Sequence, residues 1–109
     1  MTLGAREIPV EPGVVAQRLE VRLDDVRYTL HLRYLHTVGW WLLDIHDAED
    51  RPILPGRKVV PVHPLTRLAA DPRLPVGQLW AIGPRRKVTL ESLGEEHRLL
   101  YIPAQEDES

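Results

Sequence analysis

Apolar and charged residues alternate along the first predicted strand of the chain. Over residues 14–24, one face carries Leu19, Val21 and Leu23, and the other carries Arg18, Glu20 and Arg22. A period of two is typical of a β-strand with one buried face, because successive side chains point to opposite sides. The pattern predicts a half-buried strand, and the acidic pair Asp24-Asp25 predicts a tight turn after it.

The alternation continues through a second hairpin. Residues 26–34 carry apolar and aromatic side chains at even positions and polar ones at odd positions. A turn over residues 36–39 leads to residues 40–47, where Trp41, Leu43 and Ile45 alternate with Trp40, Leu42, Asp44 and His46. We therefore expect two antiparallel strands that share one apolar face.

The register of this hairpin follows from matching the two apolar faces. With the turn near residue 37 or 38, the expected cross-strand pairs are Tyr34 with Trp41, Leu32 with Leu43, and Leu30 with Ile45. The same register places His31 opposite Asp44 on the outer face. A shift by two residues would keep the faces and change the partners.

Prolines and glycines divide the rest of the chain into short elements. We expect a turn, a short strand and a turn over residues 47–56, with Pro52 and Pro55 at the edges, and another strand over residues 57–62. Further strands are predicted at 77–83 and 97–103, and short helical turns at 63–70 and at 89–94, the second capped by Thr89.

These elements predict an all-β fold. We expect a small antiparallel β-barrel or sandwich of about six to eight short strands, with one or two short helical turns. The interpretation divides the 109 residues into an N-terminal extension (1–13), a single β domain (14–103) and a disordered acidic tail (104–109).

Composition narrows the possible functions. The chain has no cysteine, so a disulfide framework, a thiolate nucleophile and a cysteine-based zinc site are excluded. No apolar run is long enough to span a bilayer, and the first nine residues lack the apolar core of a signal peptide, so we expect synthesis in a reducing cytosol. A formal net charge of −2 argues against a dedicated nucleic-acid binder.

No motif in the chain indicates an enzyme. Ser92 lacks the surrounding pattern of a serine nucleophile, and neither a phosphate-binding loop nor a dinucleotide fingerprint is present. On the outer face of the hairpin, His31, Asp44 and His46 resemble a two-histidine, one-carboxylate metal site. We interpret them instead as a cross-strand ion pair beside a solvated histidine. The sequence thus predicts no catalytic residue, no metal and no cofactor.

Two groups of residues are candidates for an assembly interface. Consecutive tryptophans on a strand point to opposite faces, so if Trp41 is in the core, Trp40 is exposed, covered by another segment or buried in a partner. Because tryptophan is enriched at interface hot spots, we assign Trp40, Leu42 and Trp80 to a contact surface. The basic turn that follows Pro84, formed by Arg85, Arg86 and Lys87, either contacts an acidic partner or DNA, or is a solvated hairpin tip.

The order of these blocks resembles a known family. They are L-x-V-x-L-D-D-x-x-Y-T-L-x-L-x-Y at 19–34, G-W-W-L-L-D-I-x-D-A at 39–48, P-I-L-x-G-x-x-V-V-P at 52–61, P-V-G-Q-L-W at 75–80, and H-R-L-L-Y-I at 97–102. In this order and spacing the chain resembles the small plug proteins of contractile-tailed phage baseplates, of the type described from a cyanophage.

The resemblance implies a structural component of the virion, made in the host cytoplasm. Such a plug sits near the central hub and the end of the tail tube, and closes or organises the baseplate until contraction. It implies several copies around the tail axis, contacts with hub and tube-end proteins, and neither a membrane nor a cofactor. The alternatives from other classes are a nucleic-acid-binding β-barrel and a generic cytosolic protein-interaction domain.

Overall fold

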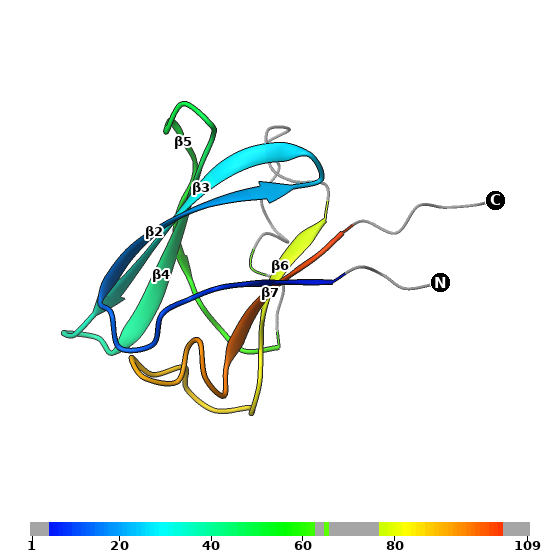
Figure 1. The fold of residues 1–109 in the computed structure, drawn as a ribbon. Helices are drawn as coiled ribbons and strands as arrows, with labels where there is room; N and C mark the ends of the chain where they lie inside the picture. Colours follow the sequence, from blue (N-terminus) through cyan, green and yellow to red (C-terminus); the bar gives the residue numbers. More distant parts are fainter. Residues whose placement is uncertain (1–4, 63–64, 66–76, 104–109) are drawn as a thin grey trace.

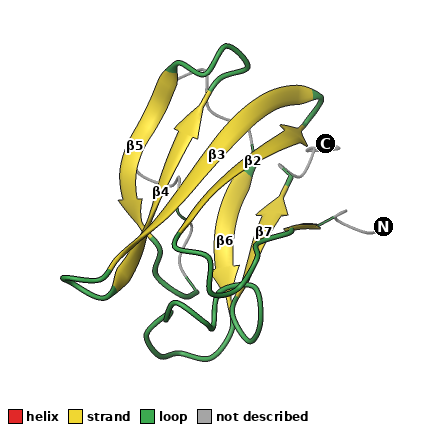
Figure 2. Cartoon of the chain, turned by 60° about the vertical axis from the view of Figure 1, so that its left-hand side comes forward, coloured by secondary structure: helices red, strands yellow, loops and turns green. Residues whose placement is uncertain are grey.

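Two antiparallel sheets form the protein, as the computed structural model shows for residues 5–62, 65 and 77–103 (Figure 1). The strands are β1 (Arg6–Ile8), β2 (Ala16–Leu23), β3 (Val26–Leu35), β4 (Trp40–His46), β5 (Pro52–Lys58), β6 (Gln78–Ile82) and β7 (Arg98–Ile102). These seven strands confirm the predicted all-β class. Within these residues there is no helix, and hence none that could cross a membrane (Figure 2).

The larger sheet has the strand order β2-β3-β4-β5. Its central register is the predicted one: Tyr34 lies opposite Trp41, Leu32 opposite Leu43, and Leu30 opposite Ile45. The β2–β3 turn is the predicted tight turn, since Asp24 and Asp25 alone separate the paired residues Leu23 and Val26. Both aspartates have positive φ (52° and 66°), the conformation that a two-residue hairpin of this twist requires.

β5 differs from the prediction because one strand runs through Pro55 and Gly56, where we expected a turn. The pairing with β4 jumps from Leu43–Arg57 to Ile45–Leu54, which leaves two residues of β5 opposite Asp44. Gly56 adopts a φ of 56°, and its N–H donates to the Asp44 carboxylate. A bulge thus absorbs the irregularity without ending the strand.

The smaller sheet has the order β1-β7-β6 and includes residues that the sequence analysis placed before the domain. Arg6–Ile8, within the expected extension 1–13, pairs antiparallel with β7. Ile8 and Val10 belong to the hydrophobic core. A three-residue strand shows too little periodicity to be predicted, and its formation depends on the free edge of a strand about 90 residues away in the sequence.

The core lies between the two sheets, which are not closed into a barrel and form a sandwich-like arrangement. The alternating inward side chains of both sheets meet there, with Trp41 as the largest fully buried residue. Residues after β5 cross to the smaller sheet, where Val62 N–H donates to the Ala81 carbonyl at 2.7 Å. The Tyr101 hydroxyl also joins the sheets, because it accepts from Gly77 N–H at 2.8 Å and donates to Asp24.

The predicted helical turns have different outcomes. Over residues 89–94, the expected cap is present, since Ser92 N–H donates to Thr89 Oγ1 at 3.1 Å, but the segment is a turn and no helix follows. The segment 63–70 lies outside the described residues except for Leu65, which is buried. The predicted tail, 104–109, also lies outside them.

Ile8→Ala tests whether β1 is part of the folded domain. Ile8 is 1% exposed, so we expect its truncation to lower the free energy of unfolding by about 2 kcal/mol, the lower end for a buried isoleucine, since it lies on an edge strand. Urea denaturation followed by circular dichroism measures the change. Glu7→Ala, on the opposite face of β1, is the control, because it removes only an exposed ion pair with Arg98 and is expected to cost less than about 1 kcal/mol. Wild-type stability of Ile8→Ala would show that β1 adds little to the fold.

Candidate functional site

The outer face of the larger sheet carries aromatic and polar side chains that could bind a partner or an ion. Along β4, Trp41, Leu43 and Ile45 are fully buried, whereas Trp40, Leu42, Asp44 and His46 are half-buried. As expected, Trp40 and Trp41 therefore point to opposite faces of β4. Two regions follow along this face: an apolar end at Trp40 and a polar end at His46.

The apolar end contains a hollow beside Trp40 of about 350 Å³. Its lining combines apolar residues from three separate segments with two lysines: Val38, Trp40, Lys58, Val59, Val60, Pro61, Lys87 and Val88. The Lys58 ammonium lies 4.1 Å from the centre of the Trp40 ring, within the range of a cation–π contact. We call this group of residues the Trp40 hollow. It offers an apolar surface with two positive charges beside it.

The structure separates the members of the predicted basic turn. Lys87 lies at the Trp40 hollow, and its ammonium is close to the Gly39 backbone. Arg86 forms an ion pair with Glu96 and holds the pKa of that carboxyl below its usual range by hydrogen bonding. Arg85 is exposed. The cluster is therefore less positive as a surface than the sequence indicates.

Trp80 lies on a different surface from Trp40. It is half-buried in β6, on the outer face of the smaller sheet, where it stands opposite Leu100 of β7. Leu42 shares the β4 face with Trp40 and pairs with Lys58. The six predicted interface residues therefore do not form one patch. Trp40 and Lys87 line the hollow, and Leu42 lies on the same face of β4 as Trp40, whereas Trp80 lies on the other sheet.

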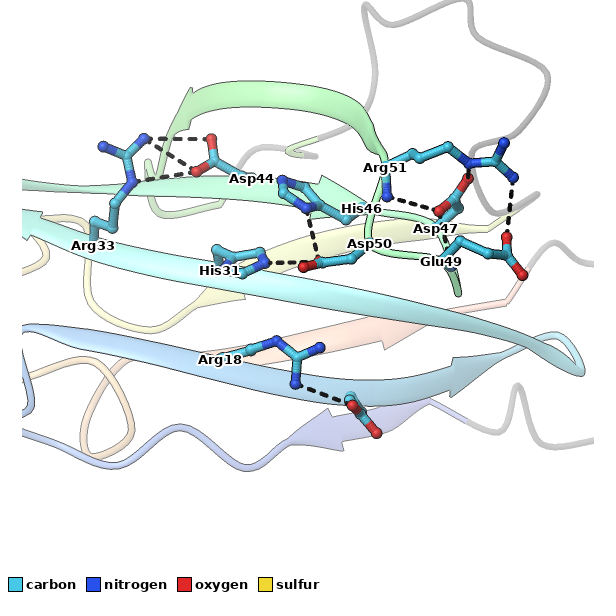
Figure 3. Close-up of polar contacts among 10 residues, drawn as sticks. Arg18, His31, Arg33, Asp44, His46, Asp47, Glu49, Asp50 and Arg51 are labelled. Atoms are coloured by element: carbon cyan, nitrogen blue, oxygen red, sulfur yellow. Dashed lines mark hydrogen bonds and ion pairs between the residues drawn. The ribbon is translucent and has the colours of Figure 1, made fainter.

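At the polar end, His31 pairs in register with Asp44, as predicted, but its side chain makes a different contact. Asp44 forms an ion pair with Arg33 at 3.1 Å and accepts from Gly56 N–H. His31 Nε2 instead lies 3.3 Å from Oδ1 of Asp50, and His46 Nδ1 lies 3.0 Å from the same atom (Figure 3). The expected His31–Asp44 ion pair is replaced by a group of His31, His46 and Asp50.

Asp50 was not among the residues predicted for this polar group. It belongs to the β4–β5 turn, which Asp47 organises by accepting from the N–H groups of Glu49 (3.0 Å) and Arg51 (2.8 Å). These backbone bonds, with Arg51 foremost, lower the pKa of Asp47, and hydrogen bonds from His31 and His46 lower that of Asp50. Because both folded-state pKa values are depressed, their stabilising contributions are present at neutral pH and are lost below about pH 4.

Ser92 and His97 also lie within hydrogen-bonding distance, at 2.8 Å between Oγ and Nδ1. Both residues are buried, Ser92 with 8% of its surface exposed and His97 with 0%. Ser92 Oγ accepts from Thr89 N–H, and the fully buried His97 uses Nε2 on the Pro84 carbonyl at 2.9 Å. These bonds close the segment that connects β6 to β7, so we assign the pair to the structure of that segment.

Comparison with known proteins identifies one family. A family model described as "Cyanophage baseplate Pam3 plug gp18" matches residues 5–105 of the 109. The match includes β1 and all the residues of the outer face described above. None of the curated proteins matches the chain.

Proposed function

Since the chain belongs to the family of cyanophage baseplate plugs, we propose that it closes or organises the centre of a contractile-tail baseplate, near the hub and the end of the tail tube, until contraction. The family is a structural one, located in the virion tail, which implies a non-enzymatic role and contacts with other baseplate proteins. The position near the hub, the arrangement in several copies around the axis and the role before contraction are parts of the proposal.

The Trp40 hollow is the observation that supports contact with a baseplate neighbour. A half-buried tryptophan beside an apolar hollow has the character of an interface hot spot, where a partner side chain fills the hollow and excludes water. Lys58 and Lys87 add positive charge at the same place. We infer that the neighbour presents an apolar side chain flanked by acidic residues, because such a surface matches the hollow in both shape and charge.

The basic turn gives little support to the alternative nucleic-acid function. Binding to single strands uses aromatic platforms along a positively charged groove. Here Arg86 is paired with Glu96, and Lys87 is next to the apolar hollow. The outer face of the larger sheet adds carboxylates at Asp44 and Asp50.

Cross-linking mass spectrometry of purified tail particles tests the position. We expect cross-links from Lys58 and Lys87 to a hub or tube-end protein, since both lysines lie at the proposed contact. Their absence, with the chain present in the particles, would place the contact elsewhere on the surface. Absence of the chain from intact particles would contradict the plug role altogether.

Trp40→Ala is expected to weaken incorporation into the baseplate. Truncation of a hot-spot tryptophan costs about 2 kcal/mol of binding or more, which corresponds to roughly 30-fold in affinity. The measurement is the number of copies per purified tail when the variant competes with the wild-type chain. Val26→Ala, an exposed apolar residue beside the β2–β3 turn, is the matched control. Equal incorporation of Trp40→Ala and the control would contradict the contact.

A further inference from the structure

Three potential metal ligands from three parts of the chain converge on the outer face of the larger sheet. His31 comes from β3, His46 from the end of β4, and Asp50 from the turn before β5 (Figure 3). One ligand atom from each residue lies within 4.8 Å of the other two. The two imidazole rings are 4.3 Å apart between centroids, and both reach the same carboxylate oxygen.

The fold holds these residues in place before any ligand binds. β3 and β4 pair through a regular register, which sets the positions of both histidines. Asp50 adopts a φ of 65°, an uncommon conformation for a residue with a side chain, while its N–H donates to the Asp47 carbonyl at 2.9 Å. The turn organised by Asp47 thus directs the Asp50 carboxylate toward the histidines.

The spacing of the donor atoms suits a tetrahedral ion. With bonds of about 2.05 Å, adjacent ligand atoms around zinc lie about 3.3 Å apart. The distances from Asp50 Oδ1 are 3.3 Å to His31 Nε2 and 3.0 Å to His46 Nδ1. One donor atom from each residue lies within 4.8 Å of the other two, so shifts of the imidazole rings toward the ion complete the geometry. Two imidazoles and one carboxylate are donors that zinc accepts readily.

We propose that His31, His46 and Asp50 form a zinc site with three protein ligands and a fourth position open to solvent. The open position follows from exposure: the side chains of His31, His46 and Asp50 are 26%, 20% and 50% exposed. The ion joins the β4–β5 turn to β3 and β4. The proposal is independent of the baseplate role, since it rests on the geometry of these three residues alone.

The positive charge of Arg18 is expected to repel a cation bound at this site. Arg18 lies opposite His31 in the β2–β3 register, and its positive charge acts on Asp50. Its ion pair with Glu20, at 3.0 Å, offsets part of that charge. We therefore expect Arg18→Gln to tighten zinc binding several-fold, because removing the positive charge reduces repulsion of the ion.

Isothermal titration of the full-length protein with zinc chloride tests the site. We expect one zinc per chain with a Kd below about 10 µM, since the site has three ligands and needs little rearrangement. Asp50→Asn and His46→Gln each remove one ligand, and each is expected to weaken binding by at least about 100-fold, the upper end of the losses seen for outer partners of a metal. His36→Gln, which removes an exposed histidine outside the group, is expected to leave the Kd unchanged.

A second measurement uses only the wild-type protein, so its result does not depend on whether the variants fold. In the wild-type protein, zinc is expected to shift the imidazole nitrogen resonances of His31 and His46 and to leave those of His36 in place. If the wild-type protein binds no zinc, or if Asp50→Asn and His46→Gln bind zinc with the same Kd as the wild type, the three residues form only a hydrogen-bonded cluster.

Discussion

Trp41→Ala is expected to lower the free energy of unfolding by about 4 kcal/mol. Trp41 is fully buried in the core, so the substitution leaves a large cavity where apolar contacts were made. The indole N–H also donates to the Thr89 carbonyl at 2.9 Å, which ties β4 to the segment that connects β6 to β7. The Tyr34 ring packs at 5.5 Å from the indole in an edge-to-face geometry, and that contact is lost as well.

Urea denaturation followed by circular dichroism measures this loss, with Trp40→Ala as the matched control. The two residues are adjacent on one strand and differ in the face that they occupy. We expect the control to cost less than about 1 kcal/mol, because its ring is only partly removed from water. Similar losses for both variants would mean that the outer face of the sheet is as important for folding as the core.

His97→Ala is expected to be the second most destabilising change, at about 3 kcal/mol. The imidazole is fully buried, and both its nitrogens form hydrogen bonds, one to Ser92 Oγ and one to the Pro84 carbonyl. Its removal creates a cavity and takes one hydrogen bond each from the Ser92 hydroxyl and the Pro84 carbonyl, which keeps its bond from Arg86 N–H. His97 also packs against Gly83, where an added Cβ would come within 2.8 Å of the imidazole Cδ2.

The same denaturation measurement, with exposed His36→Ala as control, tests the role of His97. We expect the control to stay within about 0.5 kcal/mol of the wild type, as surface substitutions usually do. His97→Ala at wild-type stability would contradict a structural role for the Ser92–His97 pair and would reopen the question of its chemistry.

The register of the central hairpin was predictable because two local signals agree. The period of two assigns each side chain of residues 26–46 to a face, and the short turn leaves few ways to align the faces. Of the alignments that keep the faces matched, the predicted one, with Tyr34 opposite Trp41, is the one that forms. Such local signals do not extend to β1, whose three residues form a strand only because β7 offers an unpaired edge.

Side-chain contacts were less predictable than strand positions. The register placed Asp44 opposite His31, but the bulge in β5 gives the Asp44 carboxylate a closer donor in Gly56 N–H. His31 then contacts Asp50, whose position depends on a turn held by Asp47. The Trp40 hollow similarly brings Lys87 beside Trp40 from a segment 47 residues away. Periodicity assigns faces and does not reveal such long-range neighbours.

The edges of the larger sheet limit how copies of the protein can join. On one side β5 contains Pro52 and Pro55, which have no N–H to offer to an additional strand. On the other side β2 alternates charged residues, and the Arg6 side chain donates to the Arg22 carbonyl. Both edges therefore discourage strand-to-strand polymerisation. Copies of the protein that meet in a particle are therefore expected to join through side-chain surfaces and not by pairing the edges of this sheet.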